Sequence, residues 1–215
     1  MKLRLLLIFS TIFTFFALRA FAQSQNAVAS TNTGLSIYID YGKLLTIPTD
    51  FELKGEAGIS FQLKNRFAPH VQLGWARLEP GGAFENGSYT SEGMYARAGV
   101  NYLLPFDATN SFYIGVRYAR SQFEETGSYQ ISSKIWPSRI EKYTRKDLQA
   151  DWFEVVFGTE KRFKQSHWYL GGNISLRILN NKEKFSPIDT YAIPGYGRAF
   201  DQTVPALNVY LKYSF

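Results

Sequence analysis

The sequence contains two histidines, His70 and His167, and no cysteine. A histidine beside a serine or a carboxylate could act as a general base in acyl transfer or lipid hydrolysis. Both histidines fall at the edges of short segments that we expect to be turns, so we interpret them as solvated turn residues. The sequence has no G-x-S-x-G elbow, H-E-x-x-H motif or phosphate-binding loop. We therefore predict no catalytic residue, no metal site and no cofactor.

A second set of residues that could do chemistry consists of charged side chains at alternate positions of otherwise apolar segments. Its five acidic and five basic members are Asp40, Glu52, Glu56, Glu154, Glu160, Lys54, Arg97, Arg117, Arg177 and Lys212. Charges removed from water are tolerated when they are paired, whereas an unpaired one is costly. The balance predicts internal salt bridges formed by Glu56, Arg97, Arg117, Glu154 and Arg177, with Glu154 paired to Arg177. The alternative for the same set is a path for protons or ions.

The elements that must position these residues are strands, because apolar and polar residues alternate with a period of two. Between Phe51 and Lys64 the odd positions are apolar or small, and the even positions are polar or glycine. Successive side chains of a strand point to opposite faces, so one face is apolar and the other polar. Eight segments follow this pattern: 34–45, 51–64, 70–79, 93–105, 112–121, 150–162, 168–179 and 206–215.

The connections between these segments alternate in length. Segments 65–69, 106–111 and 163–167 are short, whereas 80–92, 122–149 and 180–205 are long. The first connection of the second group, around Ile47-Pro48, is the exception because it is short. Short turns at one end and long loops at the other are typical of outer-membrane barrels. A secreted sandwich or a lipocalin-like barrel would also alternate with a period of two, but it gives no reason for the alternating loop lengths.

The pattern therefore predicts an all-β protein: an eight-stranded antiparallel transmembrane β-barrel of OmpA-like size, closed and filled with side chains. Each segment has about the 9–11 residues that a tilted strand needs to cross the hydrocarbon. A lumen of eight strands is just wide enough for side chains. Because such a lumen leaves no continuous water, the salt bridges are favoured over the ion path.

The two ends of the chain predict its compartment. Residues 1–22 have the features of a cleaved signal peptide: Lys2 and Arg4, an apolar run, and the small residues of Ala20-Phe21-Ala22. The alternative is an uncleaved anchor, but the apolar run is shorter than the ~20 residues of a spanning helix. We expect a short periplasmic segment over 23–33 and a barrel domain over 34–215 in the outer membrane of a Gram-negative bacterium.

The last strand closes on aromatic residues, Tyr213 and Phe215. Such an end resembles the signal that the barrel-insertion machinery reads, so we expect that machinery to be a partner.

Two of the long loops are candidate contact surfaces. The loop 126–149 is basic, and could meet lipopolysaccharide or an acidic partner, although a charge run is more often a solvated face. The loop 180–205 combines aromatic residues with turn formers, which predicts an ordered surface suited to protein contacts. Its proposed contact residues are Tyr191, Ile193, Pro194, Gly195, Tyr196 and Gly197. Three of the 24 basic residues lie in the leader, so the rest of the chain is close to balanced against 18 acidic ones and nucleic-acid binding gains little support.

Four segments together carry a family resemblance: Tyr113–Ala119, Trp152–Gly158, Leu176–Asn180 and Ile193–Gly197. In this order they resemble a Bacteroidetes family of uncharacterised small outer-membrane β-barrel proteins, a domain of unknown function. The resemblance covers about residues 34–215. It implies a small barrel that works beside a lipoprotein, as an accessory to outer-membrane protein assembly, and it transfers no catalytic residue.

These observations favour a non-catalytic scaffold or accessory subunit that binds a partner protein through its outer loops. The alternative is a lipid A-modifying or lipid-hydrolysing barrel enzyme, and the third possibility is a small, porin-like pore. The expected partners are outer-membrane lipids and lipopolysaccharide, the barrel-insertion machinery, and a lipoprotein or other outer-membrane protein.

Overall fold

The computed structural model describes residues 34–40, 52–64, 66–81, 83, 87–107, 109–131, 137–164, 166–186 and 188–215. The expected signal peptide, the segment 23–33 and the first outer loop around Ile47-Pro48 lie outside the described residues. None of the described segments forms a helix long and apolar enough to cross a membrane.

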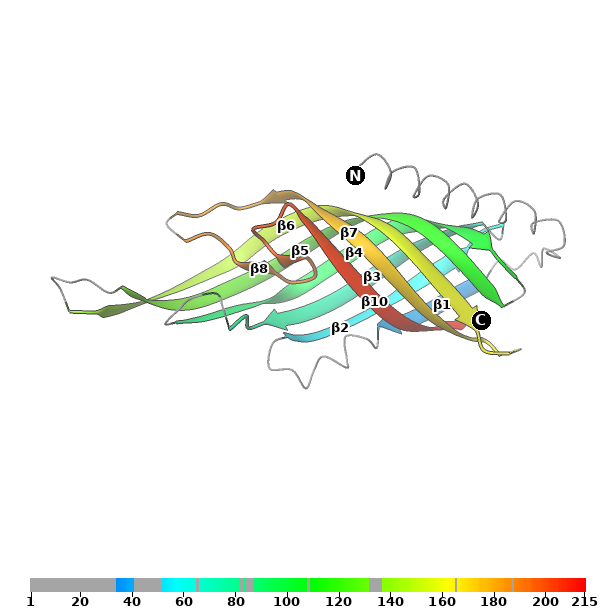
Figure 1. Ribbon diagram of the computed structural model, residues 1–215, viewed down its shortest axis with the longest axis horizontal. Coiled ribbons are helices and arrows are strands. Elements are labelled where there is room, and N and C mark those ends of the chain that lie inside the picture. The colour runs from blue at the N-terminus through cyan, green and yellow to red at the C-terminus, as the bar shows by residue number, and fades with distance from the viewer. Residues whose placement is uncertain are drawn as a thin grey trace, which may run out of the picture.

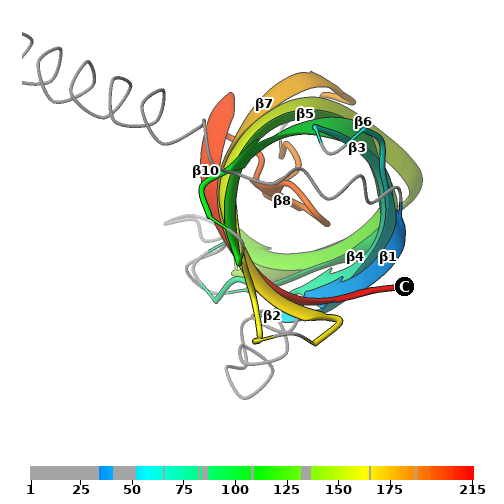
Figure 2. The same cartoon turned by 90° about the vertical axis from the view of Figure 1, so that its right-hand side faces the viewer.

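Eight long antiparallel strands form a ring in the order β1-β10-β7-β6-β5-β4-β3-β2 (Figures 1 and 2). The strands are β1 Gly34–Asp40, β2 Glu52–Gln62, β3 Phe67–Leu78, β4 Ser88–Pro105, β5 Asn110–Ile131, β6 Arg139–Arg162, β7 Trp168–Lys182 and β10 Thr203–Ser214. The first and last strands close the ring, with Ser36 opposite Ser214 and Asp40 opposite Tyr210. Two short strands, β8 Ala192–Ile193 and β9 Gly197–Arg198, form a separate sheet. The all-β fold and the eight-stranded antiparallel ring are therefore confirmed.

The period-two alternation sorts side chains between the inside and the outside of the ring. On β5, Val116 and Tyr118 point outward and are 56% and 43% exposed, whereas Arg117 and Ala119 are buried inside. The same split leaves large apolar side chains exposed around the wall, including Ile37, Ile59, Leu73, Val100, Ile114, Phe153, Phe157, Ile174, Leu176 and Leu207. A soluble sheet protein places its polar face outside, so this barrel has the opposite arrangement.

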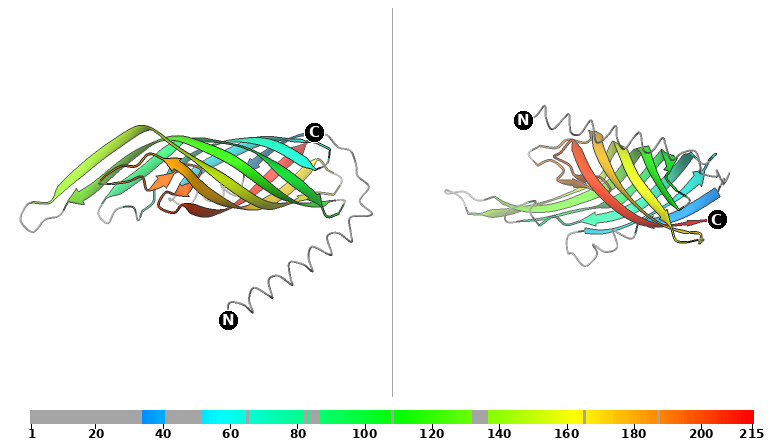
Figure 3. Two further views of the ribbon diagram at one scale, coloured as in Figure 1. Left: turned by 90° about the horizontal axis from the view of Figure 1, so that it is seen from above. Right: turned by 45° about the vertical axis from the view of Figure 1, so that its right-hand side comes forward.

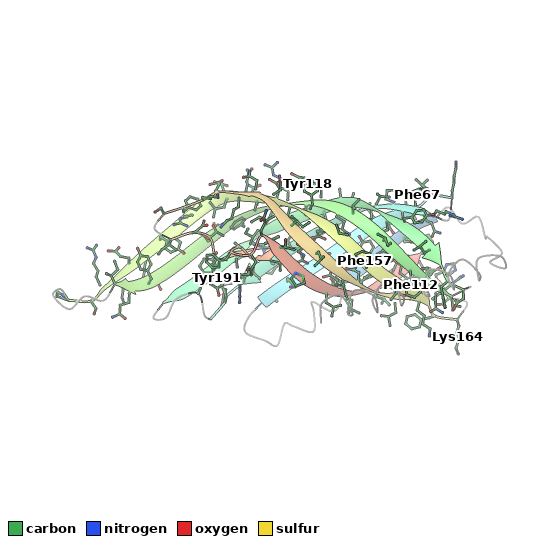
Figure 4. The ribbon with its side chains drawn as sticks, turned by 45° about the horizontal axis from the view of Figure 1, so that its top comes forward. Phe67, Phe112, Tyr118, Phe157, Lys164 and Tyr191 are labelled. Carbon is green, nitrogen blue, oxygen red and sulfur yellow. The ribbon has the colours of Figure 1, made fainter. Side chains whose placement is uncertain are left out.

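The apolar wall is bounded at both ends. Aromatic pairs gather near the short turns, which we call the turn end: Phe67 with Tyr102, Phe106 with Phe112, Trp168 with Tyr213, and Tyr213 with Phe215. Figure 4 shows Phe67 and Phe112 at this end, with Lys164 at its edge. Toward the other end the outward side chains become polar, and Asn180 Nδ2 donates to Asp151 Oδ2 at 2.6 Å. The apolar band thus ends in aromatic residues on one side and in polar residues on the other.

Strands β5 and β6 extend well beyond the predicted segments 112–121 and 150–162. Much of the predicted loop 122–149 is a β-hairpin that projects past the other strands (Figures 1 and 3). Its pairing runs from Glu125 opposite Arg145 to Ile131 opposite Arg139. We call residues 124–131 and 139–149 the projecting hairpin. The register shifts between Phe123 and Glu125. This is a bulge, which bends a strand pair and increases its twist.

The long segment after β7 returns into the ring instead of spreading over its mouth. The view along the barrel shows β8 inside the circle of strands (Figure 2). We call residues 188–199 the plug. It fills the mouth at the end that carries the projecting hairpin, which we call the hairpin end.

Five tyrosine–glycine pairs sit directly opposite each other on neighbouring strands. They are Tyr38–Gly58, Tyr95–Gly74, Tyr113–Gly158, Tyr143–Gly127 and Tyr210–Gly171. In each pair a Cβ added to the glycine would lie 2.2 to 2.5 Å from a tyrosine ring atom. Glycine is therefore required beneath each ring, because it leaves the space in which the aromatic side chain lies flat on the backbone.

We expect Gly171→Ala to destabilise the barrel by about 1–3 kcal/mol, because the new methyl group would displace the Tyr210 ring. The matched control is Gly172→Ala, where a Cβ would lie 3.6 Å from the nearest atom. Urea unfolding in detergent micelles measures both variants. Equal losses of stability in the two variants would contradict the packing argument.

Candidate functional site

A cluster of buried charges spans the lumen at the level of Glu154. The Glu154 Oε1 atom accepts a hydrogen bond from Arg97 Nε at 2.8 Å and lies 3.4 Å from Arg177 Nε. Arg117 Nη1 lies 3.8 Å from the other carboxylate oxygen of Glu154. Arg97 also pairs with Glu56. The structure thus brings together all five residues expected to form salt bridges, including the pair Glu154–Arg177.

The strand register explains this convergence. Glu154 on β6 lies opposite Arg117 on β5 and opposite Arg177 on β7, so three adjacent strands place charges in one row. Arg97 reaches the row from β4, while Glu56 lies on β2. The carboxylates and guanidinium groups are all buried, which makes their mutual pairing obligatory.

Two aromatic residues complete the cluster, and they were not predicted as members. Tyr95 Oη donates to Glu56 Oε2 at 2.8 Å, and the Arg97 guanidinium lies 4.6 Å from the centre of the Tyr95 ring. Trp152 Nε1 donates to Glu154 Oε1 at 2.8 Å. Both side chains occupy inward positions of their strands, which is the signal that could have placed them in the lumen.

The plug supplies further acceptors. Three arginines face only two glutamates in this row, and backbone carbonyls of the plug receive two of the guanidinium groups. Arg97 Nη2 donates to the Gly195 oxygen at 2.7 Å, and Arg177 Nη1 donates to the Tyr196 oxygen at 2.8 Å. Hydrogen bonds from an ionised donor are stronger than neutral ones. These two bonds therefore fix the plug to the charged row.

Apolar contacts hold the plug from its other side. Ile193 and Tyr196 are fully buried, and the Tyr196 ring packs edge-to-face on Trp152 with centroids 5.6 Å apart. Gly195 has a φ of 82°, and a Cβ there would lie 2.5 Å from the Tyr95 ring. Both the positive φ and the close approach require glycine at this turn.

The predicted partner-binding surface of the loop 180–205 must be corrected. Ala192, Ile193, Pro194 and Tyr196 lie inside the barrel, and Gly195 and Gly197 shape the turn between them. Tyr191 is half-buried at the mouth, between the rings of Tyr89 and Phe200 (Figure 4). The physical reason is that the lumen offers both an apolar pocket and buried donors that need the carbonyls of this turn. These residues therefore do not form an exposed contact surface.

The entry to the plug is held by Asp189. Lys182 Nζ lies 2.6 Å from Asp189 Oδ2, and the backbone nitrogen of Thr190 donates to Asp189 Oδ1 at 2.9 Å. Partial burial works to raise the pKa of Asp189, but these hydrogen bonds and the charge of Lys182 outweigh it and hold the pKa below its ordinary value. The ion pair turns the chain inward directly after β7.

The base of the projecting hairpin is tied to the plug by Arg145. Arg145 Nη1 lies 2.6 Å from Glu125 Oε1, and Arg145 Nη2 donates to the Ile188 oxygen at 2.8 Å. Tyr89 Oη donates to the second oxygen of Glu125 at 2.9 Å. Arg145 thus connects the hairpin to the plug through a buried carboxylate.

The half of the lumen near the turn end is filled mainly by tyrosines and polar residues. Tyr210 Oη lies within hydrogen-bonding distance of Tyr113 Oη and Glu160 Oε1, at 2.9 and 2.8 Å, and Lys212 pairs with Glu160. A cavity of about 30 Å³ remains between them and His70. Within the described residues, no group of three or more histidine, aspartate or glutamate side chains is placed to hold a metal ion.

The structure corrects the interpretation of His70 as a solvated turn residue. His70 is buried in the lumen, with Nδ1 3.2 Å from the Ala68 oxygen. Strand β3 begins at Phe67, three residues before the predicted segment 70–79, and so carries His70 inside. His167 is exposed at the turn end, with Nδ1 2.9 Å from the Ser214 oxygen.

The terminal residues Tyr213 and Phe215 lie on the outer wall at the turn end. Phe215 is 67% exposed, and its ring packs edge-to-face on Tyr213 at 5.1 Å. The backbone nitrogen of Phe215 donates to the Leu35 oxygen at 2.9 Å, which ties the last residue to β1.

Comparison with protein families gives a match to the family described as Domain of unknown function (DUF6048), over residues 4–214. The chain belongs to this family. None of the curated proteins matches the sequence. Among solved structures, the N-terminal β-barrel domain of OprF from Pseudomonas aeruginosa is similar with 7% identity and a TM-score of 0.38, covering 86% of this chain and 98% of that one.

We expect a double-mutant cycle on Glu154→Gln and Arg177→Gln to give a coupling energy of about 0.5–3 kcal/mol. Each single change should destabilise this DUF6048 barrel by about 3–5 kcal/mol, because it leaves a buried charge without its partner. The measurement is the free energy of unfolding in detergent. The control cycle uses the exposed pair Arg77–Glu79, for which we expect less than about 1 kcal/mol. A coupling energy near zero for the buried pair would contradict the assigned network.

Proposed function

We propose that this protein is a non-catalytic outer-membrane β-barrel that acts as a scaffold or accessory subunit, and that it holds a partner protein at the cell surface through the projecting hairpin. The observation that carries the proposal is a paired hairpin whose base is anchored to a barrel with a filled lumen. Such a molecule offers an attachment point in the membrane and a surface above it.

The apolar outer wall supports a place in the membrane. A soluble monomer rarely exposes a contiguous apolar patch of more than a few hundred Å², whereas here such side chains surround the barrel. A bilayer would remove this surface from water. Each of the eight ring strands also has a hydrogen-bonded neighbour on both sides, and a closed barrel is one of two architectures that can span a membrane.

The filled lumen supports a role other than a pore. The plug, the charged row and the tyrosine layer follow one another along the barrel, and the cavity of about 30 Å³ beside His70 has room for only about two or three water molecules. The third possibility, a small pore, would require continuous water through these layers.

The position of the histidines supports a non-catalytic role. Lipid A lies in the outer leaflet, at the hairpin end if the short turns face the periplasm. His70 is enclosed within the half of the lumen near the turn end, and His167 lies at that end too. The alternative, an enzyme that modifies or hydrolyses lipid through a histidine paired with a serine or carboxylate, would need that histidine near the opposite end.

The projecting hairpin is suited to hold a protein. Two paired strands fix its backbone, and the contact of Arg145 with Glu125 and Ile188 fixes its base. Near its tip, Ile131 and Ile140 are 48% and 66% exposed, which provides apolar anchors on a polar element. A lipoprotein or another outer-membrane protein is the expected partner. Lipids and lipopolysaccharide would surround the wall, and the barrel-insertion machinery would read Tyr213 and Phe215.

We expect a photo-crosslinking residue at Ile140 to capture one protein in stoichiometric yield in intact cells. The control position is Lys164, which lies at the turn end (Figure 4) and should not capture that protein. Mass spectrometry of the crosslinked species gives the result. Capture of lipid alone, together with altered lipid A acylation in a deletion strain, would overturn the scaffold in favour of the enzyme.

A further inference from the structure

Strand β6 has one edge that no strand covers within the described part of the chain. On one side, residues from Arg139 onward pair with β5. On the other side, pairing with β7 begins only at Ala150, opposite Lys182. The edge from Arg139 to Gln149 is therefore open, although Asp147 has a φ of 58° and interrupts the extended backbone at the bulge. The regular part, Arg139 to Lys146, presents a row of backbone N–H and C=O groups over about 26 Å.

The plug explains why this edge is open. After β7 ends at Lys182, the pair Lys182–Asp189 turns the chain inward. The backbone carbonyls of the following segment then accept hydrogen bonds from Arg145, Arg97 and Arg177. The segment that could otherwise continue the sheet beside β6 is thus committed to the lumen, and the edge is a consequence of the charged row.

The side chains along the edge carry an uneven charge. Arg139 pairs with Glu141 at 2.7 Å, and Arg145 pairs with Glu125. For Lys142 and Lys146, by contrast, no ion pair is found within the described residues. Ile140, Lys142, Thr144 and Lys146 are all exposed and share one face of the strand, because they are spaced by two residues.

We propose that the open edge of β6 binds an extended, acidic segment of the partner protein as an added β-strand. This inference rests on the proposed role of the hairpin as the contact surface, and it names the partner's chemistry. The added strand would place an apolar side chain opposite Ile140 and acidic side chains opposite Lys142 and Lys146. Main-chain hydrogen bonds supply affinity in this mode, and the facing side chains supply specificity.

A second copy of this chain is a poorer occupant. Two β6 edges placed side by side would bring their lysines near each other, and like charges across paired strands are destabilising. An acidic segment gains an opposite-charge pair at both positions instead. An alternative role for Lys142 and Lys146 is to prevent the open edge from pairing with other chains. In that case no peptide should bind to the edge.

The test is hydrogen exchange of the full chain in detergent micelles with a synthetic peptide of alternating threonine and glutamate that has valine at one end. We expect the peptide to slow amide exchange in Arg139–Gln149. The double variant Lys142→Glu/Lys146→Glu should weaken its affinity roughly tenfold or more, because two attractive pairs become repulsive. The matched control Lys184→Glu reverses a charge on the same end but off the edge, and should leave the affinity unchanged.

Three outcomes would overturn the proposal: no protection by the peptide, equal protection by a version with lysine in place of glutamate, or protection that rises with protein concentration alone. The last would identify a second copy as the occupant. The crosslink from Ile140 separates this inference from the proposed function. If that crosslink captures one protein while the edge stays unprotected by the peptide, the partner is held by side chains and only the added strand is excluded.

Discussion

In the lumen row around Glu154, three arginines face only two glutamates, and the path of the chain after β7 depends on that local imbalance. Arg97, Arg117 and Arg177 meet Glu154 and Glu56 in a space without bulk water. Backbone carbonyls of the plug take up two of the unmet donors, which draws the chain after β7 into the barrel. The inward path fills the mouth, and among the described segments no strand pairs with β6 on its β7 side between Arg139 and Gln149. A charge imbalance inside the barrel is thereby linked to an exposed edge outside it.

The outer wall of the barrel is apolar where the lumen is polar. Within the apolar band the inward charges have apolar or small outward neighbours on their strands, as Arg117 has Val116 and Tyr118. Exposure of this apolar wall to water would be unfavourable. In a bilayer, the charged side chains find partners inside the lumen that lipid could not provide. The same period-two alternation thus suits the side chains both to the polar lumen and to the apolar surroundings of the wall. Beyond the apolar band the contrast ends. There β4 accompanies β5 as far as Ser128, and past that point β5 and β6 alone continue among the described strands.

The sequence pattern predicted the parts in which one face is apolar and the other polar. Eight strands and the row around Glu154 follow from that contrast. The contrast fails beyond Ser121, because the outward residues Gln122 and Glu124 are polar as well. The predicted segments for β5 and β6 were therefore too short. The plug has no comparable signal, since carbonyl acceptors look alike in any sequence. Apolar Ile193 and Tyr196 within a polar loop were available as a clue, but they also fit an exposed contact surface. His70 was predicted to lie in a turn because β3 starts three residues earlier than the predicted segment.

A nitroxide scan along β5 in lipid vesicles tests the central claim most directly, because the chain has no native cysteine and each label can be placed singly. Labels at Ile114, Val116 and Tyr118 should be accessible to oxygen and protected from a water-soluble relaxation agent. The label at Gln122 should show the reverse, and a label at Ala119 should be shielded from both. Equal access of the water-soluble agent to all outward positions would contradict a barrel whose apolar wall lies in the membrane.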